Sequence, residues 1–420
     1  MGDRAQESER PLATEFVVLW QGYLVSQVGN QALTIVVLYW ALDTTGSATM
    51  MSLLTATSVV SAIVFGPIAG ALVDNVSRTR VLVVSDMLRA AAVGLLAVAM
   101  SRLAARDVLP VMFLAMAVNG AAAAFAEPAA AAVIASTIRH TQLNVANSMW
   151  QVTRQVSVIV GQAFGGLAYR TLGGSVLLAV DAATFVYSAI SAFVAGRLGG
   201  FERFGEAVSA AGFWRTFVDG FQYGRNRPGL LPFLTGVSMF NAAIAPVVVL
   251  LPLYVTQWLG QGVAWYGFLL ASLTGGAVCG SLAAARSRAT GTRRAWLLVG
   301  AFLGVGLCLV AVSVIRNRWM VSAVLAAAGA MSGAVNVMVA TFLQATTPDR
   351  YRGRVLSLHA TGSRALGPIG MLLGGVLGDL TGGNAPIVYA ACGGSAVVIA
   401  AALARSTQAR SFLATDRTNH

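Results

Sequence analysis

Lysine is absent from this 420-residue sequence, and charged residues of both signs together make up only 10% of it. A soluble domain carries about 25% charged residues, so the composition excludes an ordinary soluble globular protein. The three cysteines form no CxxC pair and the three histidines are scattered, which leaves no constellation for a metal ion. No GxxxxGK[ST] loop is present for ATP phosphates. We therefore expect no metal, no cofactor and no ATPase machinery.

Apolar runs of about the length that crosses a bilayer as a helix fill the chain instead. Hydrophobic residues make up 57% of it, and abundant glycine suits the close packing of membrane helices. These runs predict an all-α membrane protein with twelve transmembrane helices. The predicted spans are 16–42, 49–73, 81–101, 110–137, 143–170, 175–196, 230–257, 264–285, 294–315, 319–345, 355–378 and 385–404.

The predicted spans fall into two related halves. Gly165-Gly166 in the first half corresponds to Gly374-Gly375 in the second, at an offset of roughly 210 residues that other weak matches share. Such pseudo-repeats are typical of transporters with a central cavity between the halves. Aromatic residues spaced for one helix face in the linker predict an interfacial helix over 213–223. The expected segments are a tail (1–15), the first bundle (16–196), the linker (197–229), the second bundle (230–404) and a second tail (405–420).

Arginine alone supplies the 28 basic residues, and its distribution predicts the topology. If the N-terminus is cytoplasmic, twenty arginines lie on the cytoplasmic side, five on the opposite side and three within spans. Such an excess marks the cytoplasmic loops, so we expect both termini inside. The same placement in short loops argues against nucleic acid as a partner.

The stretch 66–80 carries a Gly-x-Leu-x-Asp-x-x-x-Arg-x-Arg pattern between the second and third spans. With this pattern the sequence resembles the major facilitator superfamily. The segments 19–22, 45–47, 85–89 and 348–357 resemble its macrolide-efflux-like and enterobactin-exporter-like branch, and the likeness covers nearly the whole chain. The resemblance implies a cytoplasmic gate motif made of Gly70, Asp74, Arg78, Arg80, Asp86 and Arg89.

The gate motif has a physical interpretation. Gly70 would permit close approach of helices, and Asp74 would accept charge-assisted hydrogen bonds from arginines or from a helix N-terminus. Such a contact could hold one conformation and release in the other. The alternative is an ion pair that merely orders the loop.

Two positions depart from the family pattern. The fifth-span antiporter motif usually reads Gly-Pro-x-x-Gly-Gly, but Gln162 stands where the proline is expected. In the fourth span, Asn119 replaces the basic residue that many antiporters of the family carry before a glycine. Proton antiport therefore has to be argued from other residues.

Ionisable residues inside the predicted spans supply that argument. Each costs about 2.5–3.5 kcal/mol at the bilayer centre, so it normally faces a partner or water. Glu127 and Arg154 lie at compatible depths on consecutive helices and could pair, either as a proton-coupling site or as a permanent structural contact. Asp181 is a further coupling candidate, with a solvated or capping role as the alternative. Arg364 could attract an anionic substrate group or brace the second half.

Polar side chains on the first, fourth, seventh, tenth and eleventh spans are candidates for the substrate cavity. Amides buried in a membrane must hydrogen-bond to helix, water or substrate. The candidates are Gln27, Asn30, Gln31, Asn119, Asn241, Asn336 and Arg364.

Together these features predict a secondary transporter of the bacterial cell membrane that exports a small amphiphilic molecule by alternating access, with proton antiport. The expected partners are the substrate, protons and the lipid bilayer, and we expect a monomer. A siderophore exporter fits the same motifs, whereas an importer, a facilitator and a non-transporting sensor fit less well. No Ser–His–Asp set or other catalytic cluster supports an enzyme.

Overall fold

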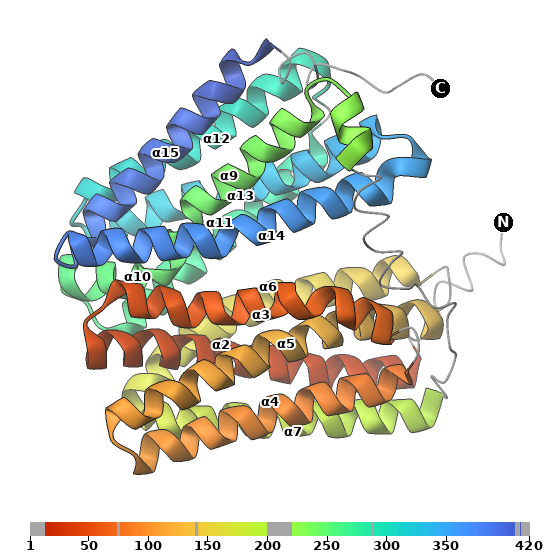
Figure 1. The fold of residues 1–420 in the computed structure, drawn as a ribbon, viewed down its shortest axis with the longest axis vertical. Helices are drawn as coiled ribbons and strands as arrows, with labels where there is room; N and C mark the ends of the chain where they lie inside the picture. Colours follow the sequence, from red (N-terminus) through yellow and green to blue (C-terminus); the bar gives the residue numbers. More distant parts are fainter. Residues whose placement is uncertain are drawn as a thin grey trace. The chain divides into compact units, whose positions relative to one another are not determined.

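The computed structural model describes residues 13–73, 76–138, 142–199, 221–287, 289–407 and 412 (Figure 1). Every regular element in these ranges is a helix, which confirms the prediction of an all-α chain. The long helices are α2 (Thr14–Thr45), α3 (Ala48–Val73), α4 (Arg78–Arg102), α5 (Ala105–Thr137), α6 (Leu143–Leu172), α7 (Gly174–Gly199), α9 (Leu230–Val249), α11 (Val263–Arg286), α12 (Gly291–Val314), α13 (Arg318–Thr346), α14 (Asp349–Leu380) and α15 (Ala385–Arg405).

Ten of the described helices are long enough and apolar enough to cross a membrane. The predicted spans coincide with the observed helices to within a few residues, except for the seventh span. Of the predicted spans, those in α6 and α14 are not among the ten. Both helices are of ample length but carry charged residues within them, including Arg154 in α6 and Arg364 in α14.

The predicted span 230–257 is interrupted. It consists of α9, a short helix α10 (Leu251–Leu253) and a five-residue π-helix (Tyr254–Trp258). Leu250 at the junction has φ −92° and ψ 2°, outside the helical region. Pro252 follows it, and because proline has no backbone N–H, a helical hydrogen bond is lost there. The prediction of one continuous span was wrong at this point.

The chain divides into two compact units. The first unit comprises residues 1–40 and 57–210, and the second comprises 41–56 and 211–420. Helix α3 therefore begins in the second unit and ends in the first. The interfacial helix predicted over 213–223 falls largely on residues 200–220, which lie outside the described ranges.

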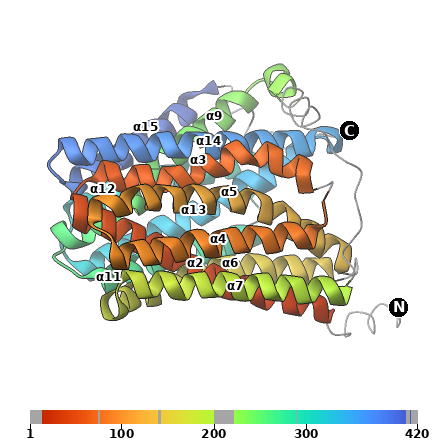
Figure 2. The ribbon, with the colours of Figure 1, turned by 60° about the horizontal axis from the view of Figure 1, so that its bottom comes forward.

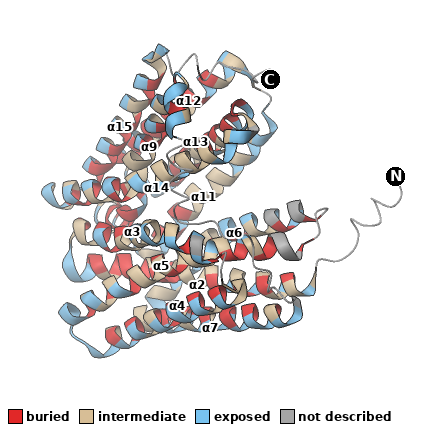
Figure 3. Ribbon diagram, turned by 45° about the vertical axis from the view of Figure 1, so that its right-hand side comes forward, coloured by how far each residue is buried: buried red, intermediate tan, exposed pale blue. Residues whose placement is uncertain are grey.

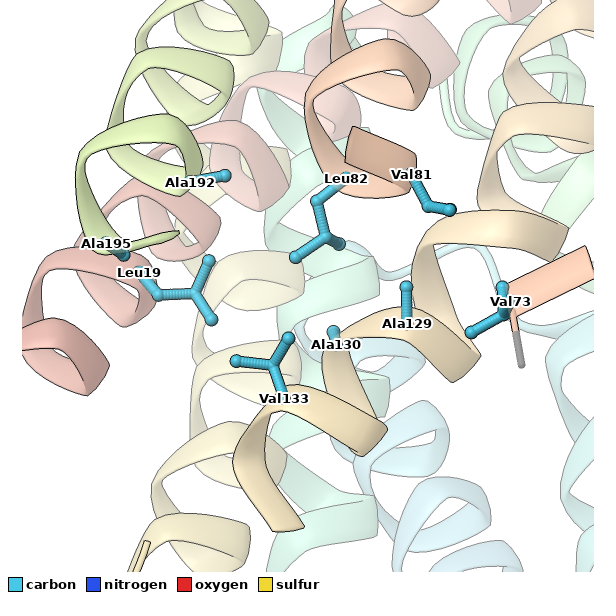
Figure 4. Close-up of a cluster of buried hydrophobic side chains, with 9 residues drawn as sticks. All are labelled: Leu19, Val73, Val81, Leu82, Ala129, Ala130, Val133, Ala192 and Ala195. Atoms are coloured by element: carbon cyan, nitrogen blue, oxygen red, sulfur yellow. The ribbon is translucent and has the colours of Figure 1, made fainter. Parts of the chain in front are cut away.

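In the first unit, α4 packs along α5 and α7 (Figures 1 and 2). One core cluster joins five helices, α2 to α5 and α7, through small and branched side chains such as Leu19, Leu82 and Val133 (Figure 4). Buried and exposed positions alternate along these helices (Figure 3). The exposed ones include large apolar side chains, among them Leu88 on α4 and Ile190 on α7, which suit contact with lipid.

In the second unit, α11 and α13 approach each other through paired glycines. A methyl group placed on Gly280 of α11 would collide with the backbone of Ala330, and one on Gly333 of α13 with the backbone of Ala277. Each helix carries two such glycines four residues apart, the small-xxx-small pattern that brings membrane helices into backbone contact.

The variant Gly280→Ala is expected to lower stability by about 1–3 kcal/mol, because the added methyl forces the two backbones apart. Gly275→Ala is the matched control, since a methyl group there meets no atom of the described residues within 4 Å. Thermal unfolding of the purified protein in detergent measures both. Equal unfolding temperatures for the two variants would show that the helices do not approach as closely as described.

Candidate functional site

Within the first unit, α2 and α6 form an aromatic surface. The rings of Tyr23 and Trp150 stack with centroids 3.8 Å apart and planes 15° apart. One turn away, Trp20 Nε1 donates a hydrogen bond of 2.8 Å to Thr153 Oγ1. A groove of about 530 Å³ runs between the same two helices. Its lining is mostly apolar and consists of Trp20, Leu24, Val145, Ser148, Met149, Val152, Thr153 and Val156.

Glu127 and Arg154, which from the sequence could pair, lie within ion-pair distance of each other. Arg154 Nη1 on α6 lies 3.9 Å from Glu127 Oε1 on α5. The two side chains are 48% and 50% exposed, so the pair is open to a ligand or to water. Trp150, which stacks on Tyr23, lies one helical turn before Arg154 on α6, so the aromatic stack is near the ion pair. An apolar surface and an accessible carboxylate thus adjoin each other.

Asp181 on α7 is fully buried, so the alternative that it is solvated is wrong. Thr184 Oγ1 lies 3.3 Å from Asp181 Oδ1 and can donate to it, and Gly29 of α2 packs directly against the same oxygen. Among the described residues, Asp181 Oδ2 is buried without a hydrogen-bond partner. An ionised carboxylate in such surroundings is costly unless a cation compensates it.

Arg89 on α4 is the cation near Asp181. It is only 7% exposed, and its Nη1 lies 3.7 Å from Asp86 Oδ1. Its guanidinium carbon lies 5.4 Å from the centroid of the Phe185 ring, one helical turn from Asp181 on α7. The sequence places Asp86 and Arg89 in the predicted gate motif, whereas it marks Asp181 as a candidate for proton coupling. Asp86 and Arg89 lie near Asp181 because α4 and α7 are rotated about their axes so that these residues face each other. The spacing of residues in the sequence does not reveal that rotation.

The remaining residues of the predicted gate motif differ in their surroundings. Arg78 Nη1 donates a 3.0 Å hydrogen bond to the carbonyl oxygen of Ala132, which ties the start of α4 to α5. A methyl group placed on Gly70 meets no described atom within 4 Å, and the close helix approach expected there stays a prediction. Arg80 is exposed, and Asp74 lies outside the described residues.

Gln162, which stands at the proline position of the antiporter motif, has a partner. Its Nε2 donates a 3.0 Å hydrogen bond to Gln31 Oε1 on α2. The neighbouring Gly161 brings α6 close to the backbone of α2 at Val28. Proline has no side-chain donor, so the departure from the family motif adds a polar link between α2 and α6.

The other predicted cavity residues are divided between the two units. Asn241 Nδ2 donates to Ser363 Oγ at 3.2 Å within the second unit. Asn30 and Asn119 each have a buried side-chain oxygen without a hydrogen-bond partner in the part of the chain that the structure describes. Asn336 and Arg364 are exposed, and Gln27 is partly buried. Together with Gln162 Oε1, these amide oxygens of the first unit have hydrogen-bonding capacity left for water or substrate.

Comparison with known sequences assigns a family to nearly the whole chain. Residues 9–418 match a family model described as a transmembrane secretion effector. The chain is 28% identical over 379 residues to the multidrug efflux pump Tap of Mycolicibacterium fortuitum, covering 86% of this chain and 88% of the pump. It is 24% identical over 382 residues to macrolide efflux protein A of Streptococcus pyogenes, covering 88% and 91%.

Solved transporters share the fold. A bacterial homologue of the human lysosomal transporter Spinster matches with a TM-score of 0.69 at 15% identity, over 95% of this chain and 96% of that one. The nucleoside transporter NupG matches with a TM-score of 0.72 at 12% identity, over 93% and 98%. At these identities the likeness shows the fold and says nothing about the substrate.

Proposed function

Since the chain belongs to the transmembrane secretion effector family of major facilitator transporters, we propose that it exports small amphiphilic drugs, antibiotics or secondary metabolites. The protein is a membrane transporter and not an enzyme. The observation that carries the proposal is the similarity, over more than four fifths of the chain, to two efflux proteins. The arginine distribution supports placing both termini in the cytoplasm.

The chemistry of the first unit supports an amphiphilic substrate. The stacked rings of Tyr23 and Trp150 and the apolar groove beside them suit a lipophilic or aromatic body. The half-exposed carboxylate of Glu127 suits a polar or cationic group. Asn30 and Asn119 offer additional hydrogen bonds. A binding surface that combines one apolar face with few polar groups fits several related molecules rather than one.

Export is coupled to protons through two carboxylates in this proposal. A proton entering from outside binds Glu127, weakens its attraction for Arg154 and favours release of the substrate; the proton leaves on the cytoplasmic side when a new substrate binds. Asp181 holds a second exchangeable proton, and the buried Arg89, which packs over Phe185 one turn from Asp181, compensates the charge of its ionised form. One proton moving down 100 mV and one pH unit releases about 3.7 kcal/mol, enough to sustain on the order of a 500-fold gradient of a neutral solute.

An efflux-deficient bacterial host tests the proposal. Cells expressing the chain are expected to accumulate less of at least one macrolide or other amphiphilic drug and to tolerate more of it than cells with an empty vector. The variant Asp74→Asn is expected to return accumulation to the vector level, because it removes the gate carboxylate, while Asp107→Asn on an exposed helix end should behave like the wild type. Equal accumulation with chain and vector for every drug tested would contradict the proposal; reduced retention of a siderophore alone would favour the siderophore exporter.

A further inference from the structure

Asp379, the penultimate residue of α14, binds the beginning of α3. Its Oδ1 accepts a hydrogen bond of 2.6 Å from the backbone N–H of Ala48. Its Oδ2 accepts bonds of 2.6 Å from Ser47 Oγ and 3.1 Å from the N–H of Thr49. Ser47 Oγ in turn accepts the N–H of Met50. The first N–H groups of α3, which have no partner within the helix, are thus satisfied by one carboxylate and the hydroxyl that it holds.

The charge of Asp379 explains why this cap is strong. The first turn of a helix carries partial positive charge, and a carboxylate there makes charge-assisted hydrogen bonds. At the end of its own helix, α14, the same carboxylate faces partial negative charge, which is unfavourable. Asp379 is therefore better stabilised by α3 than by the helix to which it belongs.

Close packing of α3 against α14 continues from the cap along both helices. We call this contact, which is made at Gly375 and Gly378 of α14, the glycine seam. A methyl group placed on Gly375 would lie 2.5 Å from Ser52 Oγ, and one on Gly378 would lie 2.7 Å from Ala48 Cβ. Ala48 and Ser52 are both fully buried. The absence of side chains on α14 at these two positions lets the first two turns of α3 lie against it, and the Asp379 cap closes the end of this contact.

Helix α3 belongs to both units. Its residues up to Ala56 belong to the second unit with α14, and those from Thr57 onward belong to the first. The segment 66–80 at its other end is the one whose pattern matches the gate motif. Any movement of the first unit relative to the second must therefore either bend α3 or release its beginning from α14.

We propose that Asp379 is a latch: its cap on α3 holds the transporter closed on the side opposite the termini and releases when that side opens. The proposal rests on the alternating-access transport proposed above. In the open state, water replaces Asp379 as the partner of the α3 amides and the glycine seam separates. A cap that served only to finish a helix would stay in place throughout the cycle.

Disulfide trapping distinguishes a latch from a permanent cap. In a chain whose three native cysteines are replaced, the pair Ala48→Cys and Gly378→Cys brings two Cβ atoms within the distance that a disulfide bridges after a small shift. Oxidation is expected to stop drug export and a reducing agent to restore it. Undiminished export by the fully oxidised protein would overturn the proposal. The same treatment of each single-cysteine variant controls for oxidation damage.

Labelling tests the latch even without transport. With Ser52→Cys as the one thiol, a membrane-impermeant maleimide added on the outer side is expected to react about tenfold faster when Asp379→Asn is also present, which corresponds to about 1.4 kcal/mol. Ser47→Ala, which leaves the two backbone bonds, should give a smaller increase, and Asp107→Asn none. Size-exclusion profiles establish that each variant is folded. Equal labelling rates with Asp379 and Asn would overturn the latch, whereas faster labelling without any drug export would count against the proposed function alone.

Discussion

Replacement of Glu127 by glutamine is expected to reduce substrate-induced proton movement at least about tenfold in proteoliposomes, because an amide neither binds nor releases a proton. Arg154, 3.9 Å away, would lose the carboxylate that compensates its charge. It would then attract water or an anion at all stages of the cycle. We expect drug binding to persist, since the Tyr23–Trp150 stack is unchanged.

Two matched variants make this result interpretable. Asp107→Asn makes the same change of charge at the exposed first turn of the same helix, so its proton movement should equal that of the wild type. Glu127→Asp retains a carboxylate on a shorter side chain and should retain part of the activity. If Glu127→Gln moved protons like the wild type, the Glu127–Arg154 contact would be structural and the coupling role wrong.

The variant Asp181→Asn is expected to abolish uphill drug accumulation while downhill exchange continues. Its carboxyl group is fully buried, contacts Thr184 and Gly29, and leaves Oδ2 without a hydrogen-bond partner. Asparagine has nearly the same shape but stays neutral, so it removes only the ability to take up and release a proton. Counterflow and gradient-driven uptake, measured on the same proteoliposomes, separate exchange from accumulation.

Thr184→Val serves as the control for packing at this position. It removes the hydroxyl that contacts Asp181 but keeps the carboxyl group, so accumulation should fall less than in Asp181→Asn. Wild-type accumulation by Asp181→Asn would show that the buried acid has no part in coupling. Loss of exchange together with accumulation would indicate damage to the fold instead.

The helices were predictable because a bilayer requires about 20 apolar residues for each crossing, and apolar runs of that length can be recognised in the sequence. The error at 230–257 arose because Pro246 and Pro252 lie inside an apolar run whose length alone suggests one helix. The prolines were visible, but which of them ends the helix depends on local packing.

The candidate site was predictable only in part. The depths of Glu127 and Arg154 on consecutive helices indicated that the two residues could pair, whereas the approach of Arg89 to Asp181 depends on how two helices are rotated. Asp379 was missed because its partners lie more than 300 residues earlier in the chain. A signal was nevertheless present, since an acidic residue at the C-terminal end of a helix is unfavourable without a partner.

Drug uptake into proteoliposomes under an imposed pH gradient tests the central claim, proton-coupled export, most directly. With the wild-type chain and an acidic interior, we expect a neutral drug that exchanges for one proton to accumulate up to about tenfold for each pH unit. A protonophore should abolish this accumulation. Uptake that reaches the same level with and without the gradient would contradict coupling and leave a facilitator with this fold.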